Sequence, residues 1–234
     1  MGTRTTYPSQ DLQAKLNIVV PTLMSEANTI WRHPNLVQLY PIYLETMHMV
    51  VRSSVSLMDA AIDTAKKKPT DSVASRLINY LEIHREEERG HDQWLLEDYA
   101  VTGGDPEFLR KKIPSTNVAE MVGAQYYWLY HYHPVSLLGH MAALEGNHPP
   151  LGFAEKLSGL SGYPIEAFRA IKRHEVLDIY HKQELYELID NLALTAEHKK
   201  IINLSGMHTM CSSVTLMATI IDSYKTKQEQ KMPA

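Results

Sequence analysis

Apolar residues recur every three or four positions along most of the 234-residue chain, which is the spacing of one face of an α-helix. Alternating runs rich in Val, Ile and Thr and bounded by turn residues, which are typical of strands, do not occur. The pattern also contains no repeat and no linker long enough to divide two domains. It therefore predicts an all-α fold, with residues 1–234 forming a single-domain bundle of about seven helices whose ends, 1–8 and 226–234, are frayed.

Proline, glycine and capping residues mark where these helices begin and end. Pro21 should kink the first helix, and Pro69 ends the second. Asp71 is placed to cap the third, a long helix that Gly103 and Gly104 close. The predicted helical segments are 9–32, 33–68, 71–104, 115–133, 134–146, 164–192 and 195–225, with a looser stretch at 151–164.

Composition narrows the class of protein. The net charge of −4 and the absence of a long Lys/Arg-rich run give no reason to expect a nucleic-acid partner. No apolar run is read as reaching membrane-spanning length, and the N-terminus lacks the apolar core of a secretion signal, so we expect no membrane association. Cys211 is the only cysteine, which favours a cytoplasmic location.

The octapeptide HEVLDIYH at 174–181 is the strongest chemical signal in the chain. His174, Asp178 and His181 occupy positions i, i+4 and i+7 of a helix, so they form one stripe. Apolar Ile171 and Leu185 fall on or beside that stripe, which therefore points inward, whereas Glu175 is expected on the outward side. Any one of the three is more often a solvated polar residue. Together, imidazoles and a carboxylate on one face predict a site for iron or manganese.

A second stripe lies in the predicted third helix. His84, Glu88 and His91 again span i to i+7, although the neighbouring EEER run also resembles a solvated helix face. Glu86 and Glu87 are expected outside. Glu145 is a lone acid at the end of an otherwise apolar segment, where burial without a cation would be costly.

The candidates from the three helices are too many for one metal ion and suit two. They are His84, Glu88, His91, Glu145, His174, Asp178 and His181. Paired metals held by ligands that project inward from facing helices are the arrangement of carboxylate-bridged di-iron sites, which react with dioxygen.

With these residues in place, the sequence resembles the heme-oxygenase-like di-iron oxidases along nearly its whole length. The late His-x3-Asp-x2-His motif at 174–181 is the most specific part of the resemblance, and Glu145 and His91 match the middle glutamate and the early histidine of the family. The resemblance implies a heme-oxygenase-like bundle that binds two ferrous ions and uses O2 as co-substrate. We also expect a homodimer and an external electron donor.

The chain departs from the family pattern at one position. Several members carry a glutamate seven residues before the early histidine, where this chain has His84. Two assignments compete: either His84 is the ligand, or Glu88 completes the site while His84 lies behind it. We favour His84 as ligand because its spacing from His91 repeats that of His174 and His181, and we expect Glu88 and Asp178 to take part in catalysis.

The resemblance implies a small-molecule substrate in natural-product biosynthesis, an amino-acid-derived metabolite above all. Relatives form nitriles from tryptophan-like amino acids, N-oxygenate amines, cleave C–C bonds or decarboxylate fatty acids, and spacing does not choose among them. Tyr126, Tyr127 and Tyr130 could line a pocket for a flat substrate, and Arg169 could hold a carboxylate. Core packing and a solvated face are the competing interpretations of these residues.

Other functions on the same fold are alternatives. A thiaminase-like hydrolase would need a cysteine nucleophile from the middle of the chain, whereas Cys211 lies in the predicted last helix. A cofactor-independent oxidase would leave the ligand stripes unused. A metal-free helical interaction protein, whose histidines only satisfy the core, would purify without iron.

Overall fold

The computed structural model describes residues 7–230, and every regular element among them is helical. The all-α prediction is therefore confirmed. The helices are α1 (Pro8–Trp31), α2 (Leu36–Val51), α3 (Ser54–Lys66), α4 (Ser72–Glu87), α5 (His91–Val101), α6 (Pro106–Lys111), α7 (Thr116–His131), α8 (Leu137–Glu145), α9 (Phe153–Ser161), α10 (Arg169–Asn191) and α11 (Ala196–Glu229), with 3₁₀ turns η1 (Pro134–Ser136) and η2 (Ile165–Phe168).

Several predicted helical segments are divided into two helices, so residues 7–230 contain more than the seven helices that were expected. The segment 33–68 breaks at Arg52 and Ser53 into α2 and α3, and the looser stretch contains the short helix α9. At the C-terminal end the opposite holds, because α11 continues to Glu229 through residues that were expected to fray. Residues 1–6 and 231–234 lie outside the described part.

The most consequential difference lies at Gly90. The predicted long helix from Asp71 ends at Glu87, turns through Glu88–Gly90, and restarts at His91. Gly90 has a φ of +85°, a left-handed conformation that glycine adopts without the steric cost that a Cβ would bring. The start was predicted correctly, since the Asp71 carboxylate accepts hydrogen bonds from the backbone N–H groups of Val73 and Ala74.

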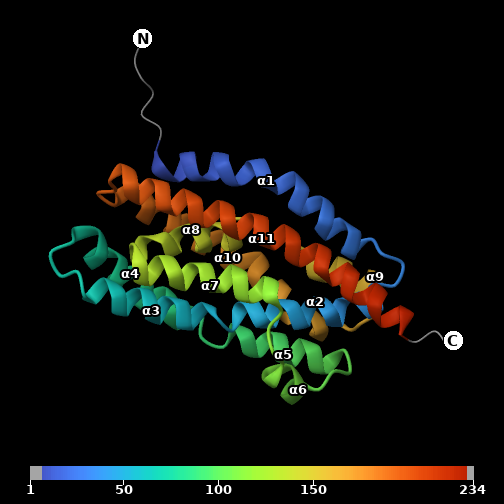
Figure 1. Ribbon diagram of the computed structural model, residues 1–234. Coiled ribbons are helices and arrows are strands. Elements are labelled where there is room, and N and C mark those ends of the chain that lie inside the picture. The colour runs from blue at the N-terminus through green and yellow to red at the C-terminus, as the bar shows by residue number, and fades with distance from the viewer. Residues whose placement is uncertain (1–6, 231–234) are drawn as a thin grey trace, which may run out of the picture.

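The helix α11 organises the bundle. It runs alongside α1 over much of the molecule and also packs against α8, α7 and α2 (Figure 1). By length and composition its 34 residues would suffice to cross a membrane, contrary to the reading of the sequence, but here its buried side contributes Ile202, Met210 and Ile220 to the core. We therefore regard it as the core helix of this bundle.

Glycine permits the close crossing of α8 and α11. A Cβ at Gly139 would lie 2.0 Å from the carbonyl oxygen of Ile202, and one at Gly206 would lie 3.1 Å from the carbonyl oxygen of Gly139. A backbone atom cannot move aside as a flexible side chain can. The close crossing thus fixes the position of α8 relative to α11, and α8 ends at Glu145 beside α10.

Candidate metal centre

The stripe on α10 points inward as predicted. Asp178 and His181 are buried, and His174 is partly buried. His174 Nδ1 lies 2.7 Å from the carbonyl oxygen of Ala170, one turn earlier. Because a carbonyl only accepts, Nδ1 carries the proton and Nε2 keeps its lone pair. This hydrogen bond therefore sets the tautomer that a metal ligand requires.

The turn between α4 and α5 brings the early candidates to the same place. His84 is in the last turn of α4, Glu88 follows its end, and His91 begins α5. Both histidines are buried, and His84 Nε2 lies 3.2 Å from Glu145 Oε1 at the end of α8. All seven predicted residues thus gather where α4, α5, α8 and α10 meet.

Glu88 belongs to two overlapping groups of side chains. His84, Glu88 and His181 can place one ligand atom each within 4.8 Å of one another, and so can Glu88, His91 and His174. The two oxygens of Glu88 face different histidines: Oε1 is 3.7 Å from His181 Nδ1, and Oε2 is 3.0 Å from His91 Nδ1. His84 and Glu88 were treated as competing ligands, but the geometry places both in one group.

The donor set fits metal ions because so many of its buried atoms lack partners. Five buried atoms of the cluster make no well-aligned hydrogen bond, namely His84 Nδ1, His91 Nδ1, Glu145 Oε2, Asp178 Oδ1 and His181 Nδ1, although His91 Nδ1 lies 3.0 Å from Glu88 Oε2. Buried polar groups are nearly always paired, and each one left unpaired costs about 1–3 kcal/mol. Within residues 7–230 no lysine or arginine forms an ion pair with Glu88, Glu145 or Asp178. Cations at the cluster would satisfy both the lone pairs and the negative charge.

The pKa values of the cluster reflect this crowding of buried charge. Burial, with the charges of Glu145 and Glu88, raises the pKa of Asp178 to about 8. Burial and the neighbouring His84 lower the pKa of His181 to about 4. For His84 burial acts downward, but the hydrogen bond to Glu145 and the surrounding carboxylates outweigh it and raise its pKa to about 9. In the metal-free protein His84 therefore serves as the counter-charge of Glu145.

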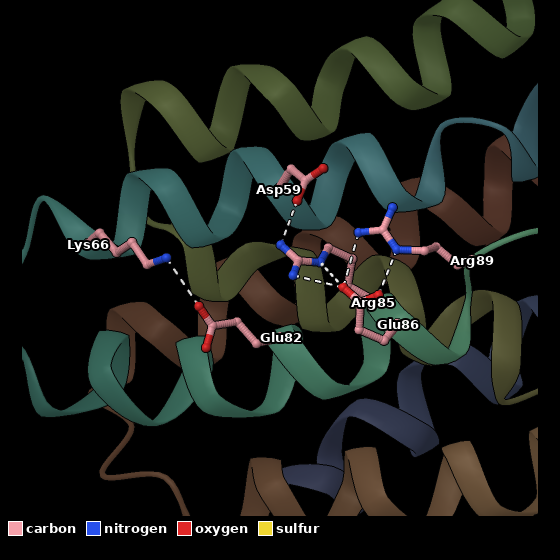
Figure 2. A network of polar contacts seen from close by, with 6 residues as sticks. All are labelled: Asp59, Lys66, Glu82, Arg85, Glu86 and Arg89. Carbon is pink, nitrogen blue, oxygen red and sulfur yellow. Dashed lines mark hydrogen bonds and ion pairs between the residues drawn. The ribbon is translucent and has the colours of Figure 1, made fainter.

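The outer face of α4 carries the charges that were read as solvated. Figure 2 shows Arg85 and Arg89 both binding Glu86, while Arg85 also reaches Asp59 and Lys66 reaches Glu82. Exposed ion pairs of this kind contribute at most about 1 kcal/mol each. Glu86 is thus outside, as predicted, and the network leaves the other side of α4 to the metal cluster.

A cavity of about 230 Å³ adjoins the cluster and is mainly apolar. Glu88, Glu145, His174 and Asp178 form its polar wall. Its other lining residues are Tyr43, Met47, Val50, Val51, Ser54, Leu95, Leu144, Asn147, His148, Pro149, Ala170 and Ile171. No lysine or arginine is among them. Four of these lining residues, Tyr43, Met47, Val50 and Val51, come from α2, whose role the sequence pattern did not reveal, because apolar residues there resemble ordinary core.

None of the predicted substrate residues lines this cavity. Tyr127 and Tyr130 on α7 are exposed, and Tyr126 packs against the core and stacks on Tyr130. Arg169 pairs with Glu97 at the surface. Their positions match the competing interpretations, core packing for Tyr126 and a solvated face for the other three.

His140 is a further buried group that the sequence reading missed. Its Nδ1 lies 2.9 Å from Thr209 Oγ1, and the ring lines a space of about 30 Å³ shared with Glu88 and Glu145. Burial lowers the pKa of His140 to about 4, so the ring is neutral. Its place in the predicted helix 134–146, five residues before Glu145, could have indicated that His140 lies near the site. The apolar residues around it made it resemble an ordinary core residue instead.

Glu175 was expected on the outward side of α10, and this expectation was wrong. The residue is buried, and its carboxylate accepts hydrogen bonds from the backbone N–H groups of Gly152 and Ala154 at 2.9 and 2.7 Å. These N–H groups stand at the start of α9, where backbone donors have no partner within the helix. Glu175 therefore fastens α9 to α10.

We expect Glu175→Ala to lower the free energy of unfolding of the metal-free protein by about 1–3 kcal/mol, since it leaves two buried N–H groups without acceptors. Urea denaturation measures this directly. Glu187→Ala, at an exposed position of the same helix, is the matched control and should change stability by less than about 0.5 kcal/mol. Equal stability of the two variants would mean that Glu175 does not hold α9.

Comparisons with known proteins identify the family and the fold. A family model described as iron-containing redox enzyme matches residues 59–211, which is well over half of the chain and spans every candidate ligand. No curated protein matches the sequence. The matched region begins in α3 and ends in α11.

Solved structures support the fold. A domain of unknown function with a heme oxygenase-like fold from Shewanella denitrificans OS217 has a TM-score of 0.76 at 15% identity, covering 94% of this chain and 92% of that one. A TenA homolog from Pseudomonas syringae pv. tomato DC3000 has a TM-score of 0.63 at 11% identity, with coverages of 95% and 98%. A TenA homologue from P. horikoshii OT3 has 0.57 at 13%, with 92% and 98%. The likeness to these structures shows the heme oxygenase-like fold, and the family match shows that the chain belongs to the iron-containing redox enzymes.

Proposed function

We propose that this protein is a non-heme oxidoreductase that binds two ferrous ions and uses dioxygen. The observation that carries the proposal is the position of Glu88, whose two carboxylate oxygens face separate histidine groups. A carboxylate so placed is suited to bridge two cations. Imidazole nitrogens and carboxylate oxygens together suit iron.

The charges of the ligands also favour two divalent ions. Three carboxylates and four histidines, neutral when they coordinate, carry a charge of about −3, which one ferrous ion would leave uncompensated in a buried site. Two ferrous ions bound together would supply electrons to dioxygen. Glu88, Glu145 and Asp178 hold that charge in place, while the His174 hydrogen bond to Ala170 keeps its ring oriented.

The cavity indicates the kind of substrate. Its volume of about 230 Å³ suits a small molecule, and its lining is apolar apart from the ligand wall and a few neutral or histidine side chains. A carboxylate group on the substrate would find no lysine or arginine there. We therefore propose a small substrate with an apolar body whose polar end faces Glu88, Glu145 and Asp178. That this substrate is an amino-acid-derived metabolite stays a prediction.

A thiaminase-like reaction is less well supported. Cys211 is exposed on α11 and does not line the cavity, so no cysteine stands where a nucleophile would meet substrate. In a metal-free interaction protein, nothing would offset the free-energy cost of the five buried polar atoms that lack well-aligned hydrogen bonds. Both observations favour the metal-dependent reaction.

Iron binding tests the proposal. The protein, loaded with Fe(II) without oxygen, should bind close to two irons per chain, and binding should weaken below neutral pH because histidines must be deprotonated to coordinate. Admitting oxygen should then cause rapid oxygen uptake, measured with an electrode. His181→Ala is the control variant, with lower iron content and slower uptake. A wild-type stoichiometry of one or none at saturating iron would refute the two-iron proposal, and uptake no faster than that of the variant would refute the use of dioxygen.

A further inference from the structure

A second opening reaches the ligands from the surface, separate from the apolar cavity. We call it the acidic hollow and define it by its lining residues, Glu87, His91, Trp94, Leu177, Tyr180, His181 and Glu184. Glu87, Tyr180 and Glu184 are exposed, so the hollow opens to solvent between α4–α5 and α10. Of these seven residues only His91 and His181 belong to the ligand set, and none of the lining is shared with the apolar cavity.

The floor of the acidic hollow consists of two buried histidines. His91 and His181 are 2% and 5% exposed, and their Nδ1 atoms face Glu88 behind the floor, at 3.0 and 3.7 Å, without making a well-aligned hydrogen bond. His181 belongs to one group of ligands and His91 to the other. A cation that enters here would therefore meet a member of each group first.

The rim of the hollow carries the carboxylates of Glu87 and Glu184, while the guanidinium of Arg173 stacks on Trp94 of the lining, 4.2 Å from its ring centre. Glu87 approaches only histidines, with Oε2 3.5 Å from His84 Nδ1 and 3.8 Å from His181 Nε2. Over residues 7–230, neither Glu87 nor Glu184 forms an ion pair with lysine or arginine. A neighbouring hollow lined by the same two glutamates also contains Arg76, which forms no ion pair with either of them.

We propose that the acidic hollow is the entry site for the divalent cation, an inference that rests on the proposed two-iron centre. Glu87 and Glu184 bind the hydrated cation weakly at the rim, since carboxylate oxygens replace water readily around such ions. The cation then exchanges its remaining water for the nitrogens of His181 and His91. Metal and substrate thus reach the centre by different routes, the metal through a charged opening and the substrate through an apolar one.

The test follows the rate of metal uptake rather than the reaction catalysed. Co(II) serves as the probe, because its visible absorption reports ligation and it is stable in air. Stopped-flow mixing of metal-free protein with Co(II) gives the rate, and titration gives the final number of ions. Glu87→Gln and Glu184→Gln, singly and together, remove rim charges with little change of shape. Glu120→Gln, at an exposed position of α7, removes the same charge away from the hollow.

We expect the double variant to take up Co(II) roughly tenfold more slowly than wild type, because electrostatic attraction raises association rates by this order. The final number of ions should be unchanged, and Glu120→Gln should match wild type. Salt should slow wild type more than the double variant, since exposed charges are screened.

Three results would overturn the inference. Equal uptake rates for the double variant and wild type would exclude the hollow as the route. A lower final number of ions in Glu87→Gln would make Glu87 a permanent ligand instead. A wild-type protein that binds no Co(II) would refute the proposed metal centre as well, whereas altered rates with a normal endpoint would leave that centre intact.

Discussion

Glu88→Ala should empty both metal positions, whereas His84→Ala should empty only one. Glu88 is the single member common to both groups of ligands, and its two oxygens lie 3.7 and 3.0 Å from histidines of different groups. Loss of a residue that only orients a ligand already weakens metal binding about 10–100-fold. Loss of a shared ligand should exceed that range at both positions. Elemental analysis after anaerobic loading and gel filtration measures the outcome.

Glu86→Ala provides the matched control for this experiment. Glu86 lies two residues away but binds Arg85 and Arg89 on the outer face of α4 (Figure 2). Its loss should leave two metals bound and alter stability by no more than about 1 kcal/mol. If Glu88→Ala retained one ion while His84→Ala lost both, His84 and not Glu88 would be the common ligand.

The α10 stripe shows how much of such a site is predictable from sequence. The interval from His174 to His181 lies wholly inside one uninterrupted helix, so helical periodicity places all three ligand side chains correctly. The same reasoning located the cap at Asp71, because a side chain that accepts backbone hydrogen bonds at a helix start acts over only two or three residues. Local rules succeed where local interactions decide.

The α4–α5 turn shows where periodicity fails. His84, Glu88 and His91 have the spacing of one helix face, yet Gly90 breaks the helix between the last two. A single glycine inside a helical pattern is often tolerated, so the sequence could not reveal the break. The turn has a consequence for the site, because it frees Glu88 from a helix interior and lets its carboxylate face both groups.

Glu175 and the predicted substrate residues show a second limit, which is set by tertiary partners. Glu175 is buried because the start of α9 supplies two N–H groups to its carboxylate. Nothing in the periodicity of α10 records that α9 packs there. The tyrosines of α7 likewise have a helical pattern, but which side faces the cluster depends on how α7 packs against α3 and α11. Contacts between distant segments decided both cases.

Asp178→Asn should stabilise the metal-free protein at alkaline pH and weaken metal binding at every pH. Asp178 is buried, its Oδ1 has no partner, and burial with the charges of Glu145 and Glu88 raises its pKa from 3.8 to about 8. The folded state thus favours the protonated carboxyl. This contribution to stability is fully present below about pH 4, where the unfolded chain is protonated as well, and it is lost as the pH rises toward 8.

The asparagine variant cannot ionise, so it escapes this loss. The two metal-free proteins should therefore differ little near pH 4, and the variant should become more stable by on the order of a few kcal/mol near pH 8. Denaturation in urea at a series of pH values measures the difference, with chelator present to exclude metal. His181 and His84 titrate in both proteins, so their effects largely cancel in the comparison.

Metal should reverse the order of stability. A ligand that binds only the folded state at 100 times its dissociation constant stabilises that state by about 2.7 kcal/mol, and an ionised Asp178 is what a divalent cation requires there. With saturating Co(II) at pH 8 the wild type should therefore gain more stability than Asp178→Asn. If the stability of the two metal-free proteins varied identically with pH, burial and the neighbouring carboxylates would not raise the pKa of Asp178. An equal gain in stability from Co(II) would show that Asp178 is not a ligand. We thus expect Asp178 to destabilise the metal-free protein at alkaline pH and to stabilise the metal-bound protein, which is the behaviour of a buried metal ligand.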